Sequence, residues 1–150
     1  MKEELVAIEK IEAQVEARDW KDALYKAGDL LVRSGDIEKE YIDHMIEAVE
    51  EYGPYIVIGK GFALGHAAPC EEVKNTAVSL INLKEGIEFG SRNDPVKVVM
   101  CLACRDKEAH MTYLQKIAAR LMEENMVEKL GSCSSKEELY RVINKKEEEE

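Results

Sequence analysis

The stretch from Val96 to Cys104 reads VKVVMCLAC, and it decides the fold class. Apart from Lys97, every residue in it is apolar. Such a run is typical of a strand that is buried on both faces of a sheet. The turn residues Asn93-Asp94-Pro95 precede it, and Asp106 follows it as the expected N-cap of a helix. A buried strand that leads directly into a helix favours an α/β fold.

The segments before this strand predict a sheet around it. In Ile11–Ala17, apolar and polar residues alternate, which indicates a half-buried strand, although the same segment could extend a helix. Tyr55–Ile58 is a short apolar run that predicts a buried strand, and the turn Gly59-Lys60-Gly61 follows it. The strands expected in this part of the chain are Ile11–Ala17, Tyr55–Ile58, Phe62–Leu64, Thr76–Leu83 and Ile87–Phe89.

Cap residues and apolar stripes predict helices between and after these strands. Asp19 is the expected N-cap of a first helix that ends at Gly35, and Gly53-Pro54 ends a second helix. Two short helices are expected near Glu124–Leu130 and Lys136–Ile143. The apolar stripes are Trp20, Leu24, Ala27 and Leu31 in the first helix, Ile42, Met45, Ile46 and Val49 in the second, and Met111, Leu114, Ile117, Ala118 and Leu121 in the helix after Asp106.

Length and composition exclude several classes of protein. A chain of 150 residues fits one domain with its own core. With 45% hydrophobic residues and a net charge of −10, it is neither a disordered chain nor a nucleic-acid binder, which needs a basic surface. It has no apolar run long enough for membrane insertion and no secretory signal, so we expect a cytoplasmic protein. We predict a single α/β domain, a mixed central β-sheet flanked by helices, over residues 1–144, and a charged disordered tail at 145–150.

Three histidines are candidates for chemistry. His44 lies off the apolar stripe of the second helix and is interpreted as a surface residue. His66 follows a predicted strand among small residues, which leaves its imidazole approachable, and imidazole is a good nucleophile near neutral pH. His110 lies in the first turn of the helix capped by Asp106, where backbone N–H groups favour an anion. His110 is either a hydrogen-bonded residue at the core edge or a group that lies over a phosphoryl group on His66.

A combination of residues in a fixed order extends over nearly the whole chain, from about Ile11 to Ile143. It comprises Asp19-Trp20, Ala23, Ala27-Gly28, Leu31, Gly35, Tyr41, Met45-Ile46, Gly53–Ile58 (GPYIVI), Gly61, Ala63-Leu64, His66-Ala67, Pro69, Phe89-Gly90, Asn93–Val96 and the helix start from Asp106 to His110. This combination resembles the EIIA domain of the bacterial sugar phosphotransferase system, in its mannitol/fructose class. The GPYIVI segment is most similar to ascorbate-type members.

The resemblance implies a phosphoryl relay. The matching histidine of the family accepts a phosphoryl group from phosphorylated HPr and passes it to a cysteine of EIIB, which phosphorylates a sugar as the membrane subunit EIIC imports it. Carried over, His66 is the phosphorylated residue, and His110 is the second histidine, which helps to hold the phosphoryl group. The resemblance implies no metal and no organic cofactor. Because the sequence ends at Glu150, we expect a free-standing EIIA.

Two features depart from the family pattern. Members usually read Pro-His-Ala-Arg at the active turn, whereas this chain reads Gly65-His66-Ala67-Ala68, which is expected to loosen the turn and removes an arginine that can pair with phosphate. The arginine that mannitol-type relatives carry late in the second helix is also absent from Glu47-Ala48-Val49. Arg105 and Lys60 are the expected substitutes, and Arg105 is preferred because its helix approaches His66. The departures leave open an alternative, a regulatory or binding module with altered or lost phosphotransfer.

The cysteines offer a third reading. Cys101 and Cys104 have the C-x-x-C spacing that some zinc and redox sites use, but Cys70 and Cys133 provide no second pair. In a buried strand, side chains three residues apart point to opposite faces. We therefore interpret Cys101 and Cys104 as structural, with a metal or redox module as the alternative.

Overall fold

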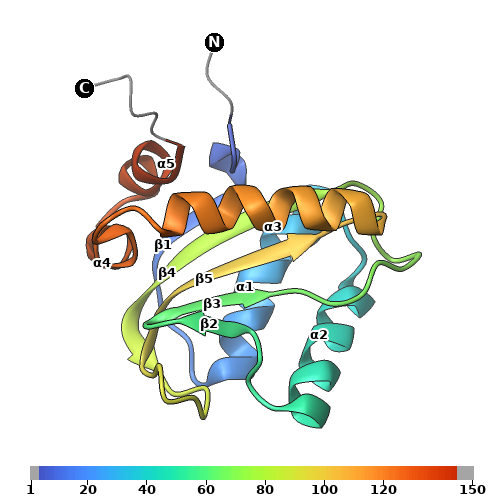
Figure 1. Cartoon of the computed structure of the whole chain (residues 1–150), viewed down its shortest axis with the longest axis horizontal. Coiled ribbons are helices and arrows are strands. Elements are labelled where there is room, and N and C mark those ends of the chain that lie inside the picture. Colours follow the sequence, from blue (N-terminus) through green and yellow to red (C-terminus); the bar gives the residue numbers. More distant parts are fainter. Residues whose placement is uncertain (1–3, 145–150) are drawn as a thin grey trace.

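The fold, obtained as a computed structural model that describes residues 4–144, is built on a five-stranded sheet (Figure 1). Its strand order is β1-β4-β5-β3-β2. The pairs β1–β4 and β3–β5 are parallel, whereas β4–β5 and β2–β3 are antiparallel, so the predicted mixed sheet is confirmed. The strands are β1 (Ile11–Val15), β2 (Val57–Gly59), β3 (Phe62–Gly65), β4 (Ala77–Ile87) and β5 (Val96–Ala103).

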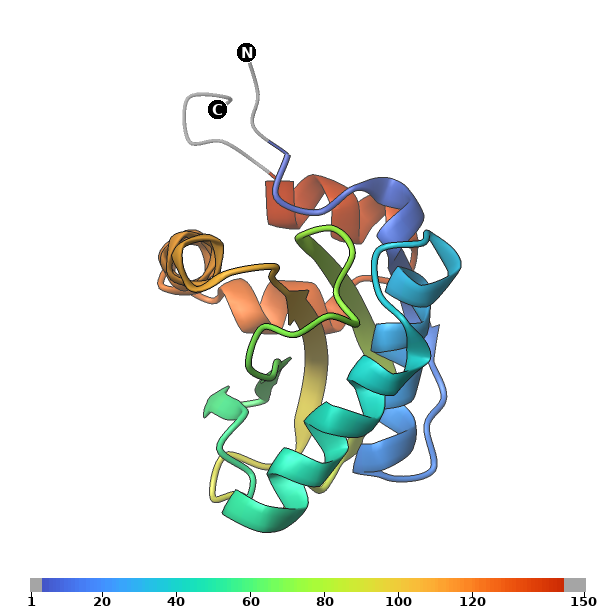
Figure 2. The same cartoon turned by 90° about the vertical axis from the view of Figure 1, so that its right-hand side faces the viewer.

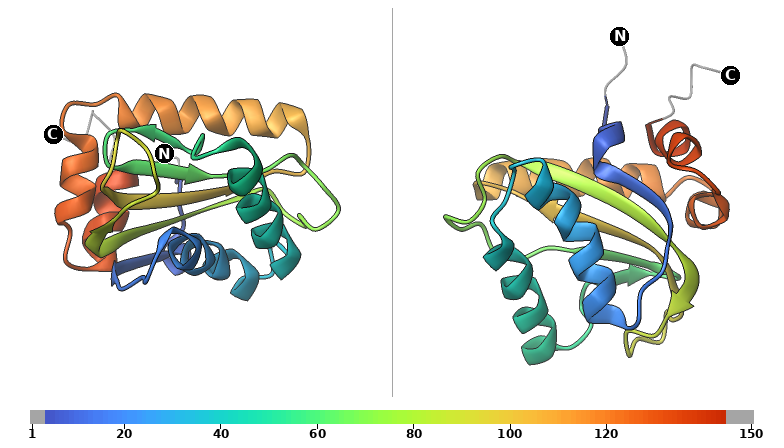
Figure 3. Two further views of the ribbon diagram at one scale, coloured as in Figure 1. Left: turned by 90° about the horizontal axis from the view of Figure 1, so that it is seen from below. Right: turned by 180° about the vertical axis from the view of Figure 1, so that it is seen from behind.

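Helices cover both faces of the sheet. On one face, α1 and α2 pack in one hydrophobic cluster, and α3, α4 and α5 contribute to a second cluster on the other face. In the left view of Figure 3, the sheet lies between α3 and the pair α1 and α2. The helices are α1 (Trp20–Arg33), α2 (Lys39–Tyr52), α3 (Lys107–Leu121), α4 (Met126–Ser132) and α5 (Lys136–Asn144), and the short 3-10 helix η1 (Ile8–Lys10) precedes β1. The predicted α/β class is confirmed.

Strand β5 is the central element, as its sequence predicts. Val99, Cys101 and Ala103 point into the cluster with α1 and α2, whereas Val98 and Met100 point into the cluster with α3. Side chains alternate between the two faces of a strand, so an unbroken apolar run supplies both cores at once.

The predicted caps fix where the helices begin and end. The Asp19 carboxylate accepts a hydrogen bond from the backbone N–H of Asp22 at 2.9 Å, which satisfies one free donor at the start of α1. Gly35 follows α1 with φ +82°, and Gly53 ends α2 with φ +89°, both in the left-handed region that favours glycine. The Asp106 carboxylate accepts from the backbone N–H of Ala109 at 2.8 Å and begins α3. These four predictions are confirmed.

Two strand predictions are wrong in their details. The segment Tyr55–Ile58 is not a buried strand, because β2 begins at Val57 and is the edge strand, with Ile58 51% exposed. Ile87–Phe89 is not a separate strand either. A single strand, β4, continues to Ile87 with a shift in its pairing with β5 after Asn82. An irregular stretch of this kind interrupts the alternation of side chains, which divides one strand into two in the sequence pattern.

The predicted apolar stripe of α3 is also partly wrong. Met111 and Ala118 are exposed. Only Leu114, Ile117 and Leu121 of that stripe pack against the core, and Ala109 and Tyr113 join them. A helix that lies on a sheet buries a narrow stripe, and Met111 and Ala118 fall beside it.

None of the helices within residues 4–144 is long and apolar enough to cross a membrane. The predicted charged tail at 145–150 lies outside the residues that the structure describes.

Candidate functional site

His66 is the first residue after β3 and lies at the end of the sheet where β3 and β5 both end. Figure 2 views this end of the sheet, where the loop after β3 lies between the N-terminal end of α3 and α2. Gly65 ends β3 in register with Cys101 of β5, and a Cβ atom on Gly65 would lie only 2.9 Å from Leu24 Cδ2. Gly65 therefore belongs to a paired strand and allows the core to pack directly behind His66, and the loosening expected at Gly65 stays a prediction.

The backbone carbonyl of Leu64 orients the imidazole of His66. His66 Nδ1 lies 2.8 Å from Leu64 O, and a carbonyl oxygen can only accept a hydrogen bond. Nδ1 therefore carries the proton, and Nε2 keeps its lone pair. Tyr55 adds a second contact, since its hydroxyl donates to His66 O at 2.9 Å and its ring meets the imidazole edge-on, with centroids 5.3 Å apart. One nitrogen of His66 is thus fixed and the other is free to react.

The surroundings keep His66 neutral. Burial lowers the pKa of its imidazole, and the nearby charge of His110 lowers that pKa further, although the hydrogen bond to Leu64 O acts in the opposite direction. The net shift is downward from the ordinary value of about 6.5. At neutral pH the ring is therefore uncharged, which is the protonation state that a nucleophilic imidazole needs.

His110 faces His66 from the first turn of α3. The two ring centroids lie 5.5 Å apart, so the structure brings together the two histidines that the sequence singles out. Because His110 belongs to the first turn of α3, this turn lies beside the two rings, and the backbone N–H groups of a helix N-terminus favour a bound anion. The arrangement offers a nucleophilic nitrogen, a second imidazole and a helix N-terminus, which together can accept and hold a phosphoryl group.

Tyr41 of α2 fixes the loop that follows His66. Its buried hydroxyl accepts a hydrogen bond from Ala67 N at 3.0 Å and lies 3.1 Å from both Ala67 O and Leu102 O. This hydroxyl joins the loop to the end of β5. The residues after His66 are therefore held in place although they form no strand.

Comparison with known proteins assigns this arrangement to a family. The sequence profile of the phosphoenolpyruvate-dependent sugar phosphotransferase system, EIIA 2, matches residues 4–146. The chain belongs to this family. It is therefore a phosphotransferase component that carries a phosphoryl group in a sugar phosphotransferase system.

Individual relatives agree with this assignment. The ascorbate-specific PTS system EIIA component of Shigella boydii is 32% identical over 147 residues, which cover 97% of this chain and 96% of the relative. The mannitol-specific cryptic phosphotransferase enzyme IIA CmtB of Escherichia coli has a TM-score of 0.86 at 27% identity, covering 95% of this chain and 97% of that one. The enzyme IIA of E. coli solved in complex with phosphorylated enzyme IIB, both of the mannitol system, has a TM-score of 0.81 at 25% identity, with coverages of 92% and 96%.

The two basic residues expected at this EIIA site lie at different ends of the sheet. Arg105 is exposed in the short connection from β5 to α3, and its backbone N–H donates to Thr76 Oγ1 at 3.2 Å. It lies five residues before His110, at the same end of the sheet as His66. Lys60 lies in the turn before β3, so the four residues of β3, roughly 13 Å of extended chain, separate it from His66. Arg105 therefore lies at the same end of the sheet as the histidines, and Lys60 lies at the opposite end.

The side chains of the two C-x-x-C cysteines lie on opposite faces of the sheet in this EIIA fold. Cys101 is buried in the cluster with α1 and α2, 3.8 Å from Met45 Sδ, whereas Cys104 is buried in the cluster with α3. Burial raises the pKa of Cys101 to about 12 and, together with the charge of Asp106, that of Cys104 to about 11. The two thiols therefore face opposite sides and stay protonated, which agrees with their structural interpretation.

Roles for Tyr41, Tyr55 and the carbonyl of Leu64 were not predicted from the sequence. Tyr41 and Tyr55 are both part of the family combination, so their presence was visible, but their contacts depend on how α2 and the loop pack. The alternation of strand β3 would not reveal the Leu64 contact either, because His66 bends back to a carbonyl two residues earlier.

Proposed function

We propose that His66 Nε2 carries the phosphoryl group, received from phosphorylated HPr in the cytoplasm and passed to a cysteine of EIIB. The observation that carries the proposal is the hydrogen bond from Nδ1 to Leu64 O, which leaves Nε2 unprotonated and directed away from the strand. Membership of the EIIA family supports the reaction class.

In the first transfer, the lone pair of Nε2 attacks the phosphorus of the HPr phosphohistidine. A bond from phosphorus to Nε2 forms, and the bond from phosphorus to the HPr nitrogen breaks, with its electron pair returning to the HPr ring. The proton on Nδ1 stays in place, so the phosphorylated ring becomes cationic, and the Leu64 carbonyl oxygen lies against that charge. In phosphoryl transfer the protein contributes mainly positioning and charge stabilisation, and both are available here.

In the second transfer, a cysteine thiolate of EIIB attacks the same phosphorus. The bond from Nε2 to phosphorus breaks, and the cationic ring takes the electron pair and becomes neutral again. The complex of a related E. coli enzyme IIA with phosphorylated enzyme IIB supports this partner class. EIIC is then an indirect partner. Because the Shigella boydii relative is named ascorbate-specific, ascorbate is the substrate that we propose for the system.

His110 and Arg105 are proposed to stabilise the phosphoryl oxygens. The ring of His110 lies 5.5 Å from that of His66, a separation that a phosphoryl group on Nε2 can bridge. Arg105 lies in the connection before α3. It would supply the cation that Ala68 does not supply. The first turn of α3 adds its backbone N–H groups to the same region.

The test is a phosphorylation assay on the full chain with phosphoenolpyruvate, enzyme I and HPr, read by intact mass. The wild type should gain one acid-labile phosphoryl group, and His66→Ala should gain none. His110→Ala should be phosphorylated about 100-fold more slowly, since loss of one preorganised group at a developing charge has an effect of this size. His44→Ala is the matched control, because His44 is exposed on α2, and it should behave as the wild type.

Two outcomes would contradict the proposal. If His66→Ala still gained an acid-labile phosphoryl group, the acceptor would be another residue. If HPr became phosphorylated but the wild type did not, and HPr from several sources gave the same result, the domain would be a binding or regulatory module that has lost phosphotransfer.

A further inference from the structure

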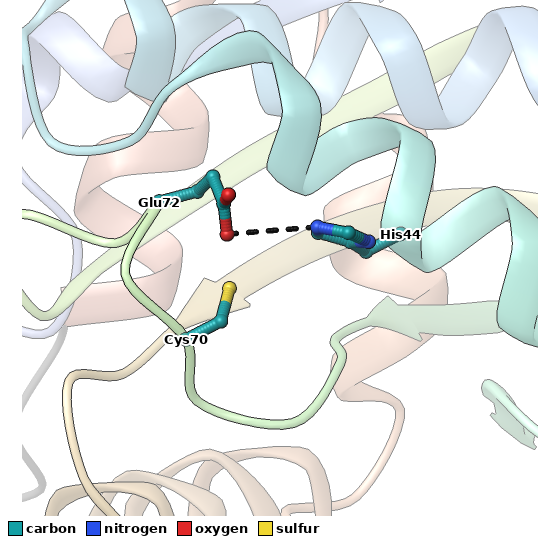
Figure 4. Close-up of side chains that lie close together, drawn as sticks. All are labelled: His44, Cys70 and Glu72. Atoms are coloured by element: carbon teal, nitrogen blue, oxygen red, sulfur yellow. Dashed lines mark ion pairs between the residues drawn. The ribbon is translucent and has the colours of Figure 1, made fainter.

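Three side chains with different ligand atoms converge beside α2 (Figure 4). His44 projects from α2, and Cys70 and Glu72 project from the loop between β3 and β4. Their nitrogen, sulfur and oxygen atoms all lie within 4.8 Å of one another. Among residues 4–144 this is the one group of three or more such side chains close enough to hold a metal ion.

The backbone around the three side chains is already ordered. The N–H of Glu38, at the start of α2, donates to Glu72 O at 2.8 Å, and Val73 N donates to Cys70 O at 3.1 Å. A bridge between Ile37 and Val73 holds the same turn. The loop therefore needs no folding to present Cys70 and Glu72 to His44, which lowers the entropy cost of binding an ion.

The spacing fits a tetrahedral zinc ion. With zinc bond lengths of about 2.0 Å to nitrogen and oxygen and about 2.3 Å to sulfur, neighbouring ligand atoms lie about 3.3–3.5 Å apart. His44 Nε2 and Glu72 Oε1 are already 3.5 Å apart. The Cys70 sulfur lies within 4.8 Å of both of these atoms, so a rotation of its side chain can complete the triangle.

We propose that His44, Cys70 and Glu72 form a surface site for one Zn²⁺ ion, with water as the fourth ligand. A His, Cys and carboxylate set is typical of zinc, which accepts nitrogen, sulfur and oxygen ligands. On binding, the thiol proton of Cys70 is released to solvent and the thiolate sulfur bonds to the ion. The net charge of −10 adds a general attraction for cations.

Glu47 lies where its carboxylate can hold the imidazole of His44 in place. Its carboxylate lies 4.0 Å from His44 Nδ1, on the other side of the imidazole from Glu72. A histidine that binds a metal through one nitrogen commonly donates the other N–H to a carboxylate, which fixes the ring. A small movement of the exposed Glu47 side chain completes that hydrogen bond.

The site is independent of the phosphoryl relay in its residues. It lies on the rim of a hollow of about 550 Å³ that is also lined by Ala67 and Ala68, the residues next to His66. None of the three ligands touches the pair His66 and His110, so zinc binding and phosphotransfer can fail separately.

The experiment uses untagged, reduced full-length protein, with Zn²⁺ affinity measured against a chromogenic chelator. Co²⁺ provides a spectroscopic probe, because a cobalt–thiolate bond gives a near-ultraviolet charge-transfer band. Cys101, Cys104 and Cys133 are buried, so this band reports on Cys70. We expect one ion per chain. Cys70→Ser should lose the band, and both Cys70→Ser and His44→Gln should lower affinity about 100-fold, since even outer residues contribute 10–100-fold.

The controls separate this site from its alternatives. His66→Ala should bind Zn²⁺ as tightly as the wild type, and circular dichroism should show that every variant is folded. Absence of stoichiometric binding would overturn the proposal. Binding that survives Cys70→Ser but is lost in His66→Ala would also overturn it, and would place the ion at the paired histidines.

Discussion

The two ends of strand β3 contrast in packing and in chemistry. At the Gly65 end, the strand is closed by Leu24 and Met45, and the next residue is His66. At the other end, the turn through Lys60 lines a hollow of about 1050 Å³, and no histidine is among its described lining residues. The larger hollow thus lies away from the paired histidines, and the smaller hollow of about 550 Å³ is lined by Ala67 and Ala68, which follow His66.

This contrast shows why cavity size does not locate the site. A carrier that exchanges phosphoryl groups with other proteins needs one reactive atom held firmly at an accessible surface, because the partner supplies the other half of the reaction centre. The Gly65 end provides that support through Leu64 O, Tyr41 and Tyr55. A deep pocket suits a small-molecule substrate instead.

The largest expected effect is on stability and comes from comparing glycines at the two ends. In Gly65→Ala, the new methyl group would lie 2.9 Å from Leu24 Cδ2 and 3.3 Å from Met45 Sδ. Overpacking of this kind costs about 1–3 kcal/mol of unfolding free energy. Gly59→Ala is the matched control, because nothing lies within 4 Å of the added atom, and its stability should change by less than about 1 kcal/mol.

Urea denaturation of both variants measures the difference. If Gly65→Ala were as stable as Gly59→Ala, the close packing behind His66 would not be a structural requirement. That result would support the expectation of a loose turn at Gly65.

Much of the fold could be predicted because it depends on local patterns. The apolar run of β5, the caps Asp19 and Asp106 and the glycine after α1 each carry their physical cause in a few neighbouring residues. The wrong strand predictions concern features that tertiary packing determines. The edge position of β2 exposes Ile58, and the irregular pairing of β4 conceals its continuity up to Ile87.

The candidate site shows the same division. His66 and His110 were predicted together through the family resemblance, and Arg105 through its position before α3. The contacts of Tyr41 with the loop after His66 could not be predicted, because they join segments far apart in the sequence. The grouping of His44 with Cys70 and Glu72 has the same origin, since no motif spacing connects a helix residue to a later loop.

The next comparison concerns the two basic residues and has an intermediate effect. Arg105→Ala should slow phosphorylation by HPr about five- to tenfold, because one exposed charge about 4 Å from a phosphoryl oxygen contributes about 1 kcal/mol in water. Lys60→Ala, at the other end of β3, should leave the rate unchanged. Rapid-quench measurements with excess phosphorylated HPr give both rates. An unchanged rate for Arg105→Ala would remove this residue from the site, and a slower Lys60→Ala would show that partners also contact the far end.

The smallest expected effect is a shift in the titration of His66. Burial is the main cause that lowers its pKa, so the neutral form should persist below pH 6.5, and reactivity should fall only as the pH drops through this lowered pKa. The sign follows from protonation of Nε2, which removes the attacking lone pair. NMR titration of the His66 ring in the unphosphorylated chain avoids the titrating groups of HPr.

The charge of His110 contributes to the lowering of the His66 pKa, so His110→Gln should raise the midpoint of the His66 titration slightly. A wild-type midpoint at or above 6.5 would mean that solvent reaches the ring, and the contrast between a closed and an open end of β3 would then be weaker than the packing indicates.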